Sequence, residues 1–448
     1  MTHFHFLIRR ATRADREALI AFNADVLRYQ DAAEPDDAVA AWTQDLLDGR
    51  HPHVGLEDFC LVEDRRSGQI ASSVCLISQT WSYGGIAFAV GQPELVGTHP
   101  DFRGQGLVRR QFEILHRWSA ARGQQLLALD GIPGFYRQFG YEMALALHGE
   151  LSVDAAALAR DTIAPRMPYR IRPAVESDVA FIADTADGAH GRYLVAACRD
   201  ATLWRYELHG RSRDSQPRAA FAVIEALDGS RVGFLAHRPR LLGTFLTLTA
   251  YELVPSATWE AVTPRVLQYL RWMGDEYGAS AGTHCERIGL CLGSNHPVYG
   301  ALQHLAPRDE GAYAWQVRVH DLPAFLRHVA PVLERRLAQS SLAEFTGQLR
   351  ISLYRDGVRL GFERGRIVEV AAWRVPLGLA GVDKGVPSTA ERADAALQLG
   401  TFLQLLFGYR SFDELQYAYP DCLVRHDTAR TLLTAMFRKQ PSDVWPVL

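Results

Sequence analysis

The central feature of the sequence is ELVGTHPDFRGQGLVRR, residues 94–110. A short apolar run ends at Pro100, an arginine- and glycine-containing loop follows, and Val108, Phe112 and Leu115 then recur at helical spacing. The pattern predicts a strand, a loop and a helix, in that order. The backbone N–H groups of a glycine loop and the positive end of a helix dipole together suit a pyrophosphate group.

The spacing of the glycines separates two kinds of pyrophosphate loop. A dinucleotide-binding fingerprint would have a third glycine three residues after Gly106, and Arg109 occupies that position. The loop instead resembles motif A of the GNAT superfamily of acetyl-CoA-dependent N-acetyltransferases, whose pattern is Arg or Gln, two residues, Gly, one residue, and Gly or Ala. Gly104 and Gly106 match its glycines, whereas Asp101 departs from its first position. The resemblance implies acetyl-CoA as co-substrate, bound by Val96, Gly97, Thr98, Arg103, Gly104, Gln105, Gly106, Leu107, Val108, Arg109, Gly131 and Ile132.

A second segment, DGIPGFYRQFGYE at residues 130–142, resembles the part of GNAT enzymes in which a tyrosine precedes a Gly-aromatic strand. Acetyl transfer releases a thiolate with a pKa of about 8.5, and a phenol with a pKa of about 10 can hydrogen-bond to it. Because full proton transfer would be uphill by about 2 kcal/mol, we expect Tyr136 to stabilise the thiolate as general acid. The alternative is that Tyr136 is an ordinary half-buried aromatic residue.

Length and composition limit the class of protein. The 448 residues exceed one compact domain and suggest three. A net charge of −3 gives no reason to expect nucleic acid as a partner. Early charged residues and the lack of an apolar run near 18 residues predict neither a signal peptide nor membrane insertion, and therefore a cytoplasmic protein. Six cysteines without a Cys-x-x-Cys pair predict no metal site and no disulfide framework.

The start of the chain is repeated. Ile171, Arg172, Pro173 and Ala174, followed by Asp178, match Ile8 to Ala11, followed by Asp15, at identical spacing. We therefore expect an internal duplication, with a second GNAT-like fold from residue 165 to 320. The second copy has no glycine from Pro255 to Pro264, where a coenzyme loop would lie, so we expect it to bind no coenzyme.

The pattern changes after residue 321. Two short helices are predicted at Pro323–His328 and Pro331–Leu337, then a three-strand meander from Gln348 to Ala371, then helices at Ala393–Phe407 and Thr428–Phe437. This α+β block resembles the sterol carrier protein domain, which follows two GNAT domains in acetyltransferases of the Eis (enhanced intracellular survival) type.

The resulting fold prediction is mixed α+β. It comprises a catalytic GNAT domain (1–152), a degenerate GNAT-like domain (153–321) and a sterol-carrier-like domain (322–448). The family resemblance also implies a homo-oligomer, specifically a hexamer.

The reaction also requires a proton acceptor. A lysine-like amine with a pKa of about 10.4 is protonated at pH 7 and has to lose a proton. Neither His116 nor any carboxylate near motif A is identifiable as the base from the sequence. In Eis-type enzymes the C-terminal carboxylate has this role, which here implies Leu448. The alternative is that the apolar tail packs for stability alone.

The predicted function is acetyl transfer to a primary amine of a small cationic substrate, such as an aminoglycoside or a polyamine, by direct attack in a ternary complex. Backbone N–H groups of Val96–Thr98 would polarise the carbonyl. Two alternatives stay open: a binding protein for coenzyme or an apolar ligand that catalyses nothing, and a peptide or protein acetyltransferase.

Overall fold

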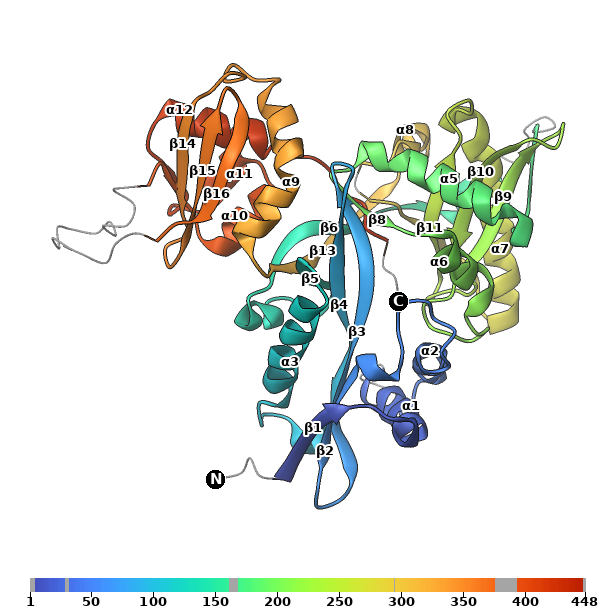
Figure 1. Cartoon of the computed structure of the whole chain (residues 1–448). Helices are drawn as coiled ribbons and strands as arrows, with labels where there is room; N and C mark the ends of the chain where they lie inside the picture. Colours follow the sequence, from blue (N-terminus) through green and yellow to red (C-terminus); the bar gives the residue numbers. More distant parts are fainter. Residues whose placement is uncertain (1–4, 29–31, 161–167, 294, 375–392, 446–448) are drawn as a thin grey trace.

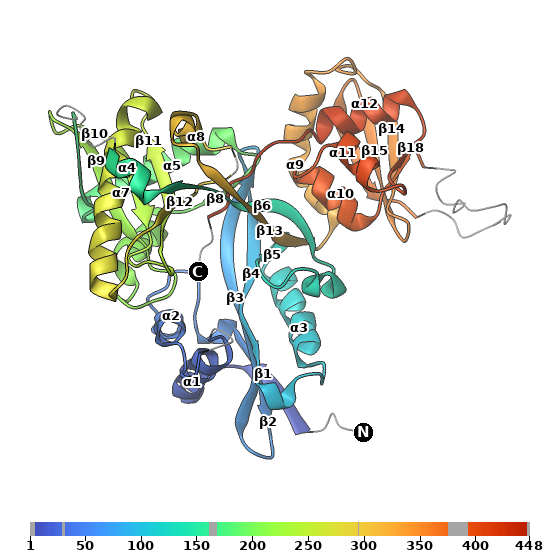
Figure 2. The same ribbon diagram turned by 180° about the vertical axis from the view of Figure 1, so that it is seen from behind.

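The computed structural model describes residues 5–28, 32–160, 168–293, 295–374 and 393–445. The chain folds into three lobes (Figures 1 and 2). Within the described residues the strands form a 13-stranded sheet that runs through the first two lobes and a five-stranded sheet in the third. No described helix is both long enough and apolar enough to cross a lipid bilayer.

The first lobe is a sheet with helices on both faces. On one face Phe112 and Leu115 of α3 pack on Leu127 and Leu129 of β5. On the opposite face α1 and α2 pack against β3, around Cys75. Its elements are β1 (Phe6–Arg10), α1 (Arg16–Val26), α2 (Asp37–Leu47), β2 (Phe59–Asp64), β3 (Gln69–Tyr83), β4 (Ile86–Thr98), α3 (Leu107–Ala121), β5 (Leu126–Leu129) and β6 (Glu142–Asp154).

The second lobe repeats the order of strands and helices of the first, with α4 and the strand β8, which pairs with β3, as additional elements. Its parallel pair β11 and β12, joined by the long helix α7, corresponds to β4 and β5 joined by α3. Its elements are α4 (Ala155–Arg160), β7 (Tyr169–Pro173), α5 (Val179–Ala189), β8 (Val195–Cys198), α6 (Ala201–Arg205), β9 (Ala220–Ala226), β10 (Arg231–His237), β11 (Phe245–Leu253), α7 (Trp259–Ala281), β12 (Arg287–Cys291), α8 (Val298–Ala301) and β13 (Arg308–Val319).

The two lobes exchange strands. β13, the last strand of the second lobe, lies between β5 and β6, with Gln316 opposite Leu129 and Val317 opposite Ala128 on β5. The far end of β6 pairs in turn with β12. The two lobes therefore share one hydrogen-bonded sheet.

The duplication is visible as a repeated ion-pair cluster. Arg9 contacts Asp15 at 2.7 Å and Glu63 at 2.8 Å. In the second copy Arg172 contacts Asp178 at 2.6 Å and Glu225 at 2.7 Å. The register is also the same, because each glutamate lies two residues beyond the residue opposite the arginine, Leu61 or Val223.

The third lobe packs helices against an antiparallel meander. The meander prediction is confirmed by its strands, and the pairs β14·β17 and β17·β18 extend the sheet. Its elements are α9 (Leu322–Leu337), β14 (Gly347–Ser352), β15 (Gly357–Glu363), β16 (Arg366–Ala372), β17 (Ala395–Ala396), α10 (Leu399–Leu406), α11 (Phe412–Ala418), β18 (Leu423–Val424) and α12 (Asp427–Met436).

Two helix predictions in this lobe were wrong. The two short helices are one helix, α9, with Pro331 inside it. An interior proline costs about 3 kcal/mol, which the burial of Leu326, Val329 and Leu333, about 1.5–3 kcal/mol each, outweighs. The helix predicted from Ala393 starts at Leu399, because Ala395 and Ala396 pair with β14 as the short strand β17.

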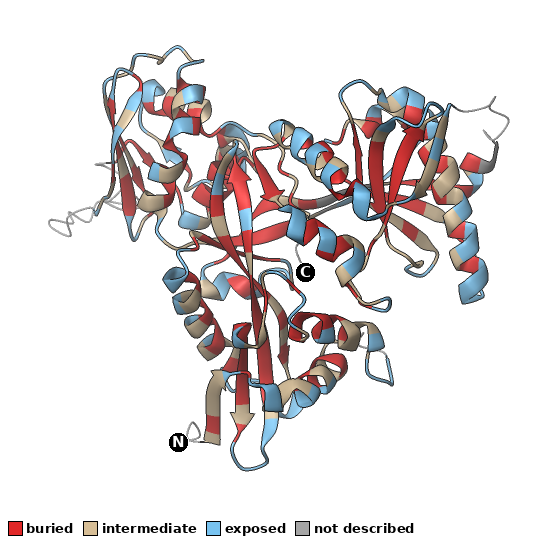
Figure 3. Cartoon of the chain, turned by 45° about the vertical axis from the view of Figure 1, so that its right-hand side comes forward, coloured by how far each residue is buried: buried red, intermediate tan, exposed pale blue. Residues whose placement is uncertain are grey.

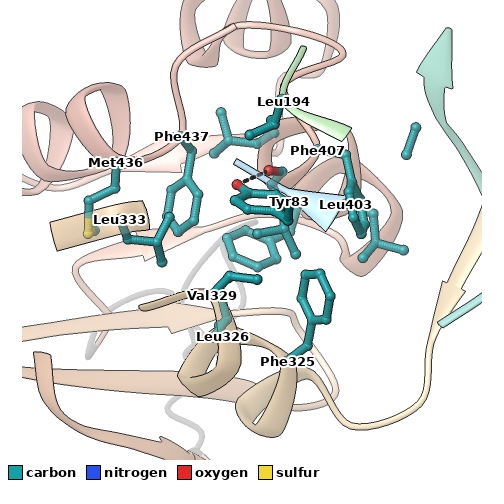
Figure 4. Packing of buried hydrophobic residues seen from close by; sticks show 14 of the residues in the cluster. Tyr83, Leu194, Phe325, Leu326, Val329, Leu333, Leu403, Phe407, Met436 and Phe437 are labelled. Carbon is teal, nitrogen blue, oxygen red and sulfur yellow. Dashed lines mark hydrogen bonds between the residues drawn. The ribbon is translucent and has the colours of Figure 1, made fainter. Parts of the chain in front are cut away.

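The hairpin between β3 and β4 joins the first lobe to the third. Tyr83, at its tip, lies among Phe325 of α9 and Phe407 at the end of α10, and its hydroxyl donates to the carbonyl of Leu406 at 2.7 Å (Figure 4). Figure 3 shows β3 and β4 buried over much of their length. One hydrophobic core therefore extends from the hairpin into the third lobe.

The first ion-pair cluster predicts a pH-dependent contribution to stability. Hydrogen bonds from Arg9 lower the pKa of Asp15 to about 2. The resulting stability is fully present above about pH 4 and is lost as pH falls through about 2. Asp15→Asn should lower the free energy of unfolding by about 1 kcal/mol at pH 7, a value discounted for partial solvent access.

Urea unfolding at pH 7 and pH 3 measures this difference, which should shrink at the lower pH. The control is Asp413→Asn, because Asp413 pairs with Arg430 but its side chain is 76% exposed. That change should cost less than about 0.5 kcal/mol. Equal losses of unfolding free energy from both substitutions would contradict the stabilising role of the Arg9–Asp15 ion pair.

Candidate active site

A bulge in β4 opens the sheet of the first lobe. Leu95 has a φ of 52°, and the pairing with β3 shifts so that Gly97 lies opposite Ser73 and Glu94 opposite Cys75. Positive φ at a bulky residue is strained and marks functional sites. In the described residues, β4 and β5 pair at two positions alone, Val90–Leu126 and Gly91–Leu127. The strands then separate, and Val96–Thr98 line the separated edge of β4.

The predicted pyrophosphate loop follows at the same edge. Gly104 and Gly106 are exposed, have φ values of 75° and 71°, and have no atoms within 4 Å of the position that a Cβ would occupy. Gly106 is the N-cap of α3, and no side chain caps the helix. The first turn of α3 therefore has N–H groups available for an anion.

The other predicted loop residues differ in how accessible they are. Arg103 and Gln105 are exposed, and Arg103 donates from Nε to the carbonyl of Thr98 at 3.3 Å. Leu107 is buried and anchors the helix, whereas Val108 is partly buried. Arg109 donates to Gln138 at 2.6 Å. The structure thus brings Val96 to Thr98 and Arg103 to Arg109 together at one end of β4.

Tyr136 lies at the end of β5, on the short 3₁₀ helix Phe135–Phe139. Its ring packs beside Phe112, with centroids 5.6 Å apart, and over the backbone of Gly131. Burial, together with the carboxylates of Glu94 and Asp130, raises the pKa of Tyr136. The hydroxyl therefore keeps its proton and can donate it to a hydrogen bond.

β13 holds the segment beneath this tyrosine. The carbonyl of Gly131 accepts hydrogen bonds from Tyr313 and, at 3.0 Å, from Nε2 of Gln316. The neighbouring Ile132 is exposed. The predicted residues Gly131 and Ile132 therefore adjoin Tyr136 at the separated strand ends.

Two carboxylates missed from the sequence also belong to this site. Glu94 lies on β4 immediately before the bulge, and Asp130 directly follows β5. Burial and then the Asp130 charge raise the pKa of Glu94 to about 8. From the sequence no carboxylate near motif A was identifiable as the base, and the structure adds Glu94 and Asp130 as candidates. The available signal was that Asp130 directly follows β5, at the carboxyl end of a parallel strand, where ligands bind in open sheets. Glu94 lies within β4, close to that end of β5.

His116 is a poor candidate for the base. Its Nε2 lies 3.3 Å from the hydroxyl of Tyr141. Burial and the nearby Arg318 and His320 lower the pKa of His116 to about 3. Tyr299, the counterpart of Tyr136 in the second lobe, is buried and donates its hydroxyl to the carbonyl of Leu290.

The C-terminal tail can be followed as far as Trp445, and Leu448 lies outside the described residues. Asp443 forms a parallel bridge with Ala196 of β8, and the carbonyl of Val444 accepts from Nε1 of Trp315 at 3.2 Å. Trp445 packs beside Phe221, with ring centroids 5.8 Å apart. The tail is thus docked against the second lobe and beside β8.

The comparisons with known proteins agree with this geometry. Residues 7–144 match the family model described as an acetyltransferase (GNAT) domain. The chain therefore contains a GNAT acetyltransferase domain. This domain makes the protein an acetyltransferase, and its bounds include the motif A loop, both carboxylates and Tyr136. No curated protein sequence matches the chain significantly.

Solved structures extend the fold similarity beyond the GNAT domain. A probable N-acyltransferase of Enterococcus faecalis V583 is 13% identical, with a TM-score of 0.66, covering 98% of this chain and 100% of that one. A GCN5-related N-acetyltransferase of Anabaena variabilis is 13% identical, with a TM-score of 0.65, covering 98% and 99%. Eis1 of Mycobacterium abscessus is 14% identical, with a TM-score of 0.61, covering 97% and 98%. At these identities the likeness shows the fold, a mixed α+β architecture with tandem GNAT folds.

The contact between Gly131 and Tyr136 in the GNAT domain yields a prediction. Gly131 has a φ of 156°, and a Cβ there would lie 2.7 Å from Cε2 of Tyr136. Gly131→Ala should therefore displace the tyrosine and lower kcat more than about tenfold. Thiol release on mixing enzyme, acetyl-CoA and an amine measures this rate.

The matched control is Gly134→Ala. Gly134 also has a positive φ, 76°, but has no atom within 4 Å of its Cβ position. This variant should lose about 1 kcal/mol of stability from backbone strain and keep most of its turnover. Similar kcat values for the two variants would contradict the proposed contact.

Proposed function

We propose that this enzyme is an acetyl-CoA-dependent N-acetyltransferase of the Eis type, which acetylates a primary amine of a small cationic substrate by direct attack in a ternary complex. The observation that carries the proposal is the group formed by Glu94, Asp130 and Tyr136 where β4 and β5 separate, together with the uncapped start of α3, which follows β4 in the chain. This group combines a proton acceptor, a proton donor and an anion site.

The residues present fit an acyl-CoA. Its diphosphate is an anion, and an uncapped helix N-terminus preceded by Gly104 and Gly106 suits one. The residues that would hold the coenzyme are Val96 to Thr98, Arg103 to Arg109, Gly131 and Ile132. When bound, acetyl-CoA supplies an acetyl thioester and a thiolate leaving group.

In this proposal Glu94 accepts a proton from the attacking amine. Transfer from an ammonium of pKa about 10.4 to an ordinary glutamate of pKa about 4.3 is uphill by about 8 kcal/mol. With the pKa of Glu94 raised to about 8, the same transfer costs about 3 kcal/mol. The environment of Glu94 therefore makes it a far better base than an exposed carboxylate.

Tyr136 supports departure of the thiolate. Because its pKa is raised, complete transfer of its proton to a thiolate of pKa about 8.5 is unfavourable. A hydrogen bond from the hydroxyl still stabilises the negative sulfur in the transition state. In this proposal backbone N–H groups of Val96–Thr98 polarise the thioester carbonyl.

The carboxylates of the site indicate the class of the amine substrate. Glu94 and Asp130 attract a cation when they are ionised, and a desolvated site strengthens that attraction. We therefore favour an aminoglycoside or a polyamine over a neutral amine. The fold similarity to Eis1 of Mycobacterium abscessus is compatible with this choice.

The proposal includes the architecture of the whole chain. We assign residues 1–152 to a catalytic domain, 153–321 to a degenerate GNAT-like domain without coenzyme, and 322–448 to a sterol-carrier-like domain. We further propose a cytoplasmic homo-oligomer, a hexamer by analogy with the Eis type. The carboxylate of Leu448 is an additional candidate for positioning the amine or accepting its proton.

The first test compares Glu94→Gln and Tyr136→Phe in a thiol-release assay over aminoglycosides, polyamines and lysine peptides. Each change should lower kcat roughly 100-fold or more, because each removes a group that moves or shares a proton. Glu113→Gln, an exposed change on α3, is the control and should leave kcat unchanged.

The same assay has a diagnostic pH dependence. A base is active when deprotonated, so kcat/KM should rise as pH increases through about 8, and Glu94→Gln should remove that limb. Acetyl-CoA binding in calorimetry without thiol release from any amine would favour a binding protein. Activity confined to peptides would favour a peptide or protein acetyltransferase.

The tail gives a separate prediction. Deleting Val447 and Leu448, or adding a short C-terminal tag, should reduce kcat at least tenfold while far-UV circular dichroism stays unchanged. The same tag at the N-terminus is the control. Full turnover after deletion would remove the terminal carboxylate from the mechanism without affecting the assignment of Glu94.

A further inference from the structure

A buried chain of polar side chains leads to Glu94. Nε1 of Trp81 donates to Oε1 of Gln79 at 2.8 Å, and Nε2 of Gln79 donates to Oε1 of Gln92. Nε2 of Gln92 then donates to Oε1 of Glu94 at 2.5 Å. Trp81, Gln79 and Gln92 are all buried. The chain therefore connects the hydrophobic core to the catalytic carboxylate.

The chemistry of the side chains fixes the direction of these hydrogen bonds. An indole N–H can only donate, so Gln79 has to present its oxygen to Trp81 and its NH₂ group to Gln92. Gln92 therefore accepts through its oxygen and presents its own NH₂ group to Glu94. An ionised carboxylate only accepts, so the series is fully matched when Glu94 carries its negative charge.

The register of β3 and β4 makes this series of hydrogen bonds from Trp81 to Glu94 possible. Gln79 and Trp81 are two residues apart on β3, and Gln92 and Glu94 are two residues apart on β4, so each pair shares a face of the sheet. Gln79 lies opposite Val90, which makes Gln92 its diagonal neighbour. Glu94 lies opposite Cys75, whose side chain packs among those of α1 and α2, so the series lies on the face opposite α3.

The far end of the series is held rigidly. The ring of Trp81 packs edge-on against Trp315 of β13, with centroids 5.5 Å apart. Trp315 in turn donates to the tail carbonyl of Val444 at 3.2 Å. The indole that sets the direction of the hydrogen bonds is thus fixed by β13, and through β13 by the docked tail.

We infer that Gln92 is a positioning residue for acetyl transfer, oriented by Gln79 and Trp81 so that its amide N–H fixes the orientation of the Glu94 carboxylate near Asp130. This inference rests on the proposed role of Glu94 as base. Among titratable groups, Asp130 after β5 acts on Glu94, and the Glu94 charge in turn raises the pKa of Tyr136 on its 3₁₀ helix and of the Cys75 thiol on β3. The Gln92 N–H is a donor that favours the charged form, and it opposes the effects of burial and of Asp130.

The test is Gln92→Met, which keeps the length of the side chain and removes the donor. Without the N–H, the pKa of Glu94 rises, so the acidic limb of kcat/KM should move to higher pH by about one unit. At a pH below the limb this shift is about a tenfold loss. Gln404→Met, a change of a buried glutamine on α10 in the third lobe, is the matched control and should leave the limb in place.

A double-mutant comparison shows whether Gln92 acts through Glu94. In a Glu94→Gln background, Gln92→Met should cost nothing further, because the carboxylate it positions is absent. Trp81→Phe keeps an aromatic ring and removes the fixed donor, so it should shift the limb in the same direction by a smaller amount. It also serves as the second variant if Gln92→Met folds poorly.

The outcomes distinguish the proposed role of Glu94 as base from the inferred role of Gln92 as its positioning residue. Full activity in Glu94→Gln overturns the assignment of the base and, with it, this inference. A large loss in Glu94→Gln combined with an unshifted limb in both Gln92→Met and Trp81→Phe overturns the inference alone. An equal additional loss from Gln92→Met in the Glu94→Gln background shows that Gln92 acts independently of Glu94.

Discussion

The pairing of β13 with β5 is the constraint on which the site depends. β5 is four residues long and ends at Leu129, immediately before Asp130 and Gly131. β13 reaches this strand from the end of the second lobe and supplies Tyr313 and Gln316, which hold the carbonyl of Gly131. The second copy of the fold therefore contributes a strand that holds part of the candidate site in the first copy. This contribution does not require the second copy to bind a ligand.

The site separates opposite charges across the thickness of one sheet. The uncapped N-terminus of α3 lies on one side, where the helix dipole favours an anion. Glu94 shares the opposite face with residues packed against α1 and α2, where its carboxylate, when ionised, would favour a cation. The gap between β4 and β5 joins these two environments. An anionic coenzyme and a cationic amine could then approach from different sides without competing for the same groups.

The features that the sequence predicted well depend on neighbours close in the chain. The glycine loop, the short helix that carries Tyr136 and the meander of the third lobe follow from spacing and turn residues. The match of residues 7–144 to the GNAT domain model confirms the resemblance that the glycine loop and the tyrosine segment indicated.

The features that the sequence did not reveal depend on contacts between distant segments. Glu94 and Asp130 meet only because two parallel strands share a register, and Pro331 stays within α9 because both sides of it bury apolar side chains. The insertion of β13 beside β5 requires two copies of the fold to exchange strands. No local pattern encodes that exchange.

The burial of Tyr83 in the third lobe has a consequence for biosynthesis. The hairpin that carries it is made early, but the helices that cover it, α9 and α10, come from the last third of the chain, and so does β13. At about 5–20 residues per second, the ribosome leaves that aromatic tip and the edge of β5 uncovered for tens of seconds. The first lobe therefore reaches its final packing only after the last third of the chain has been made.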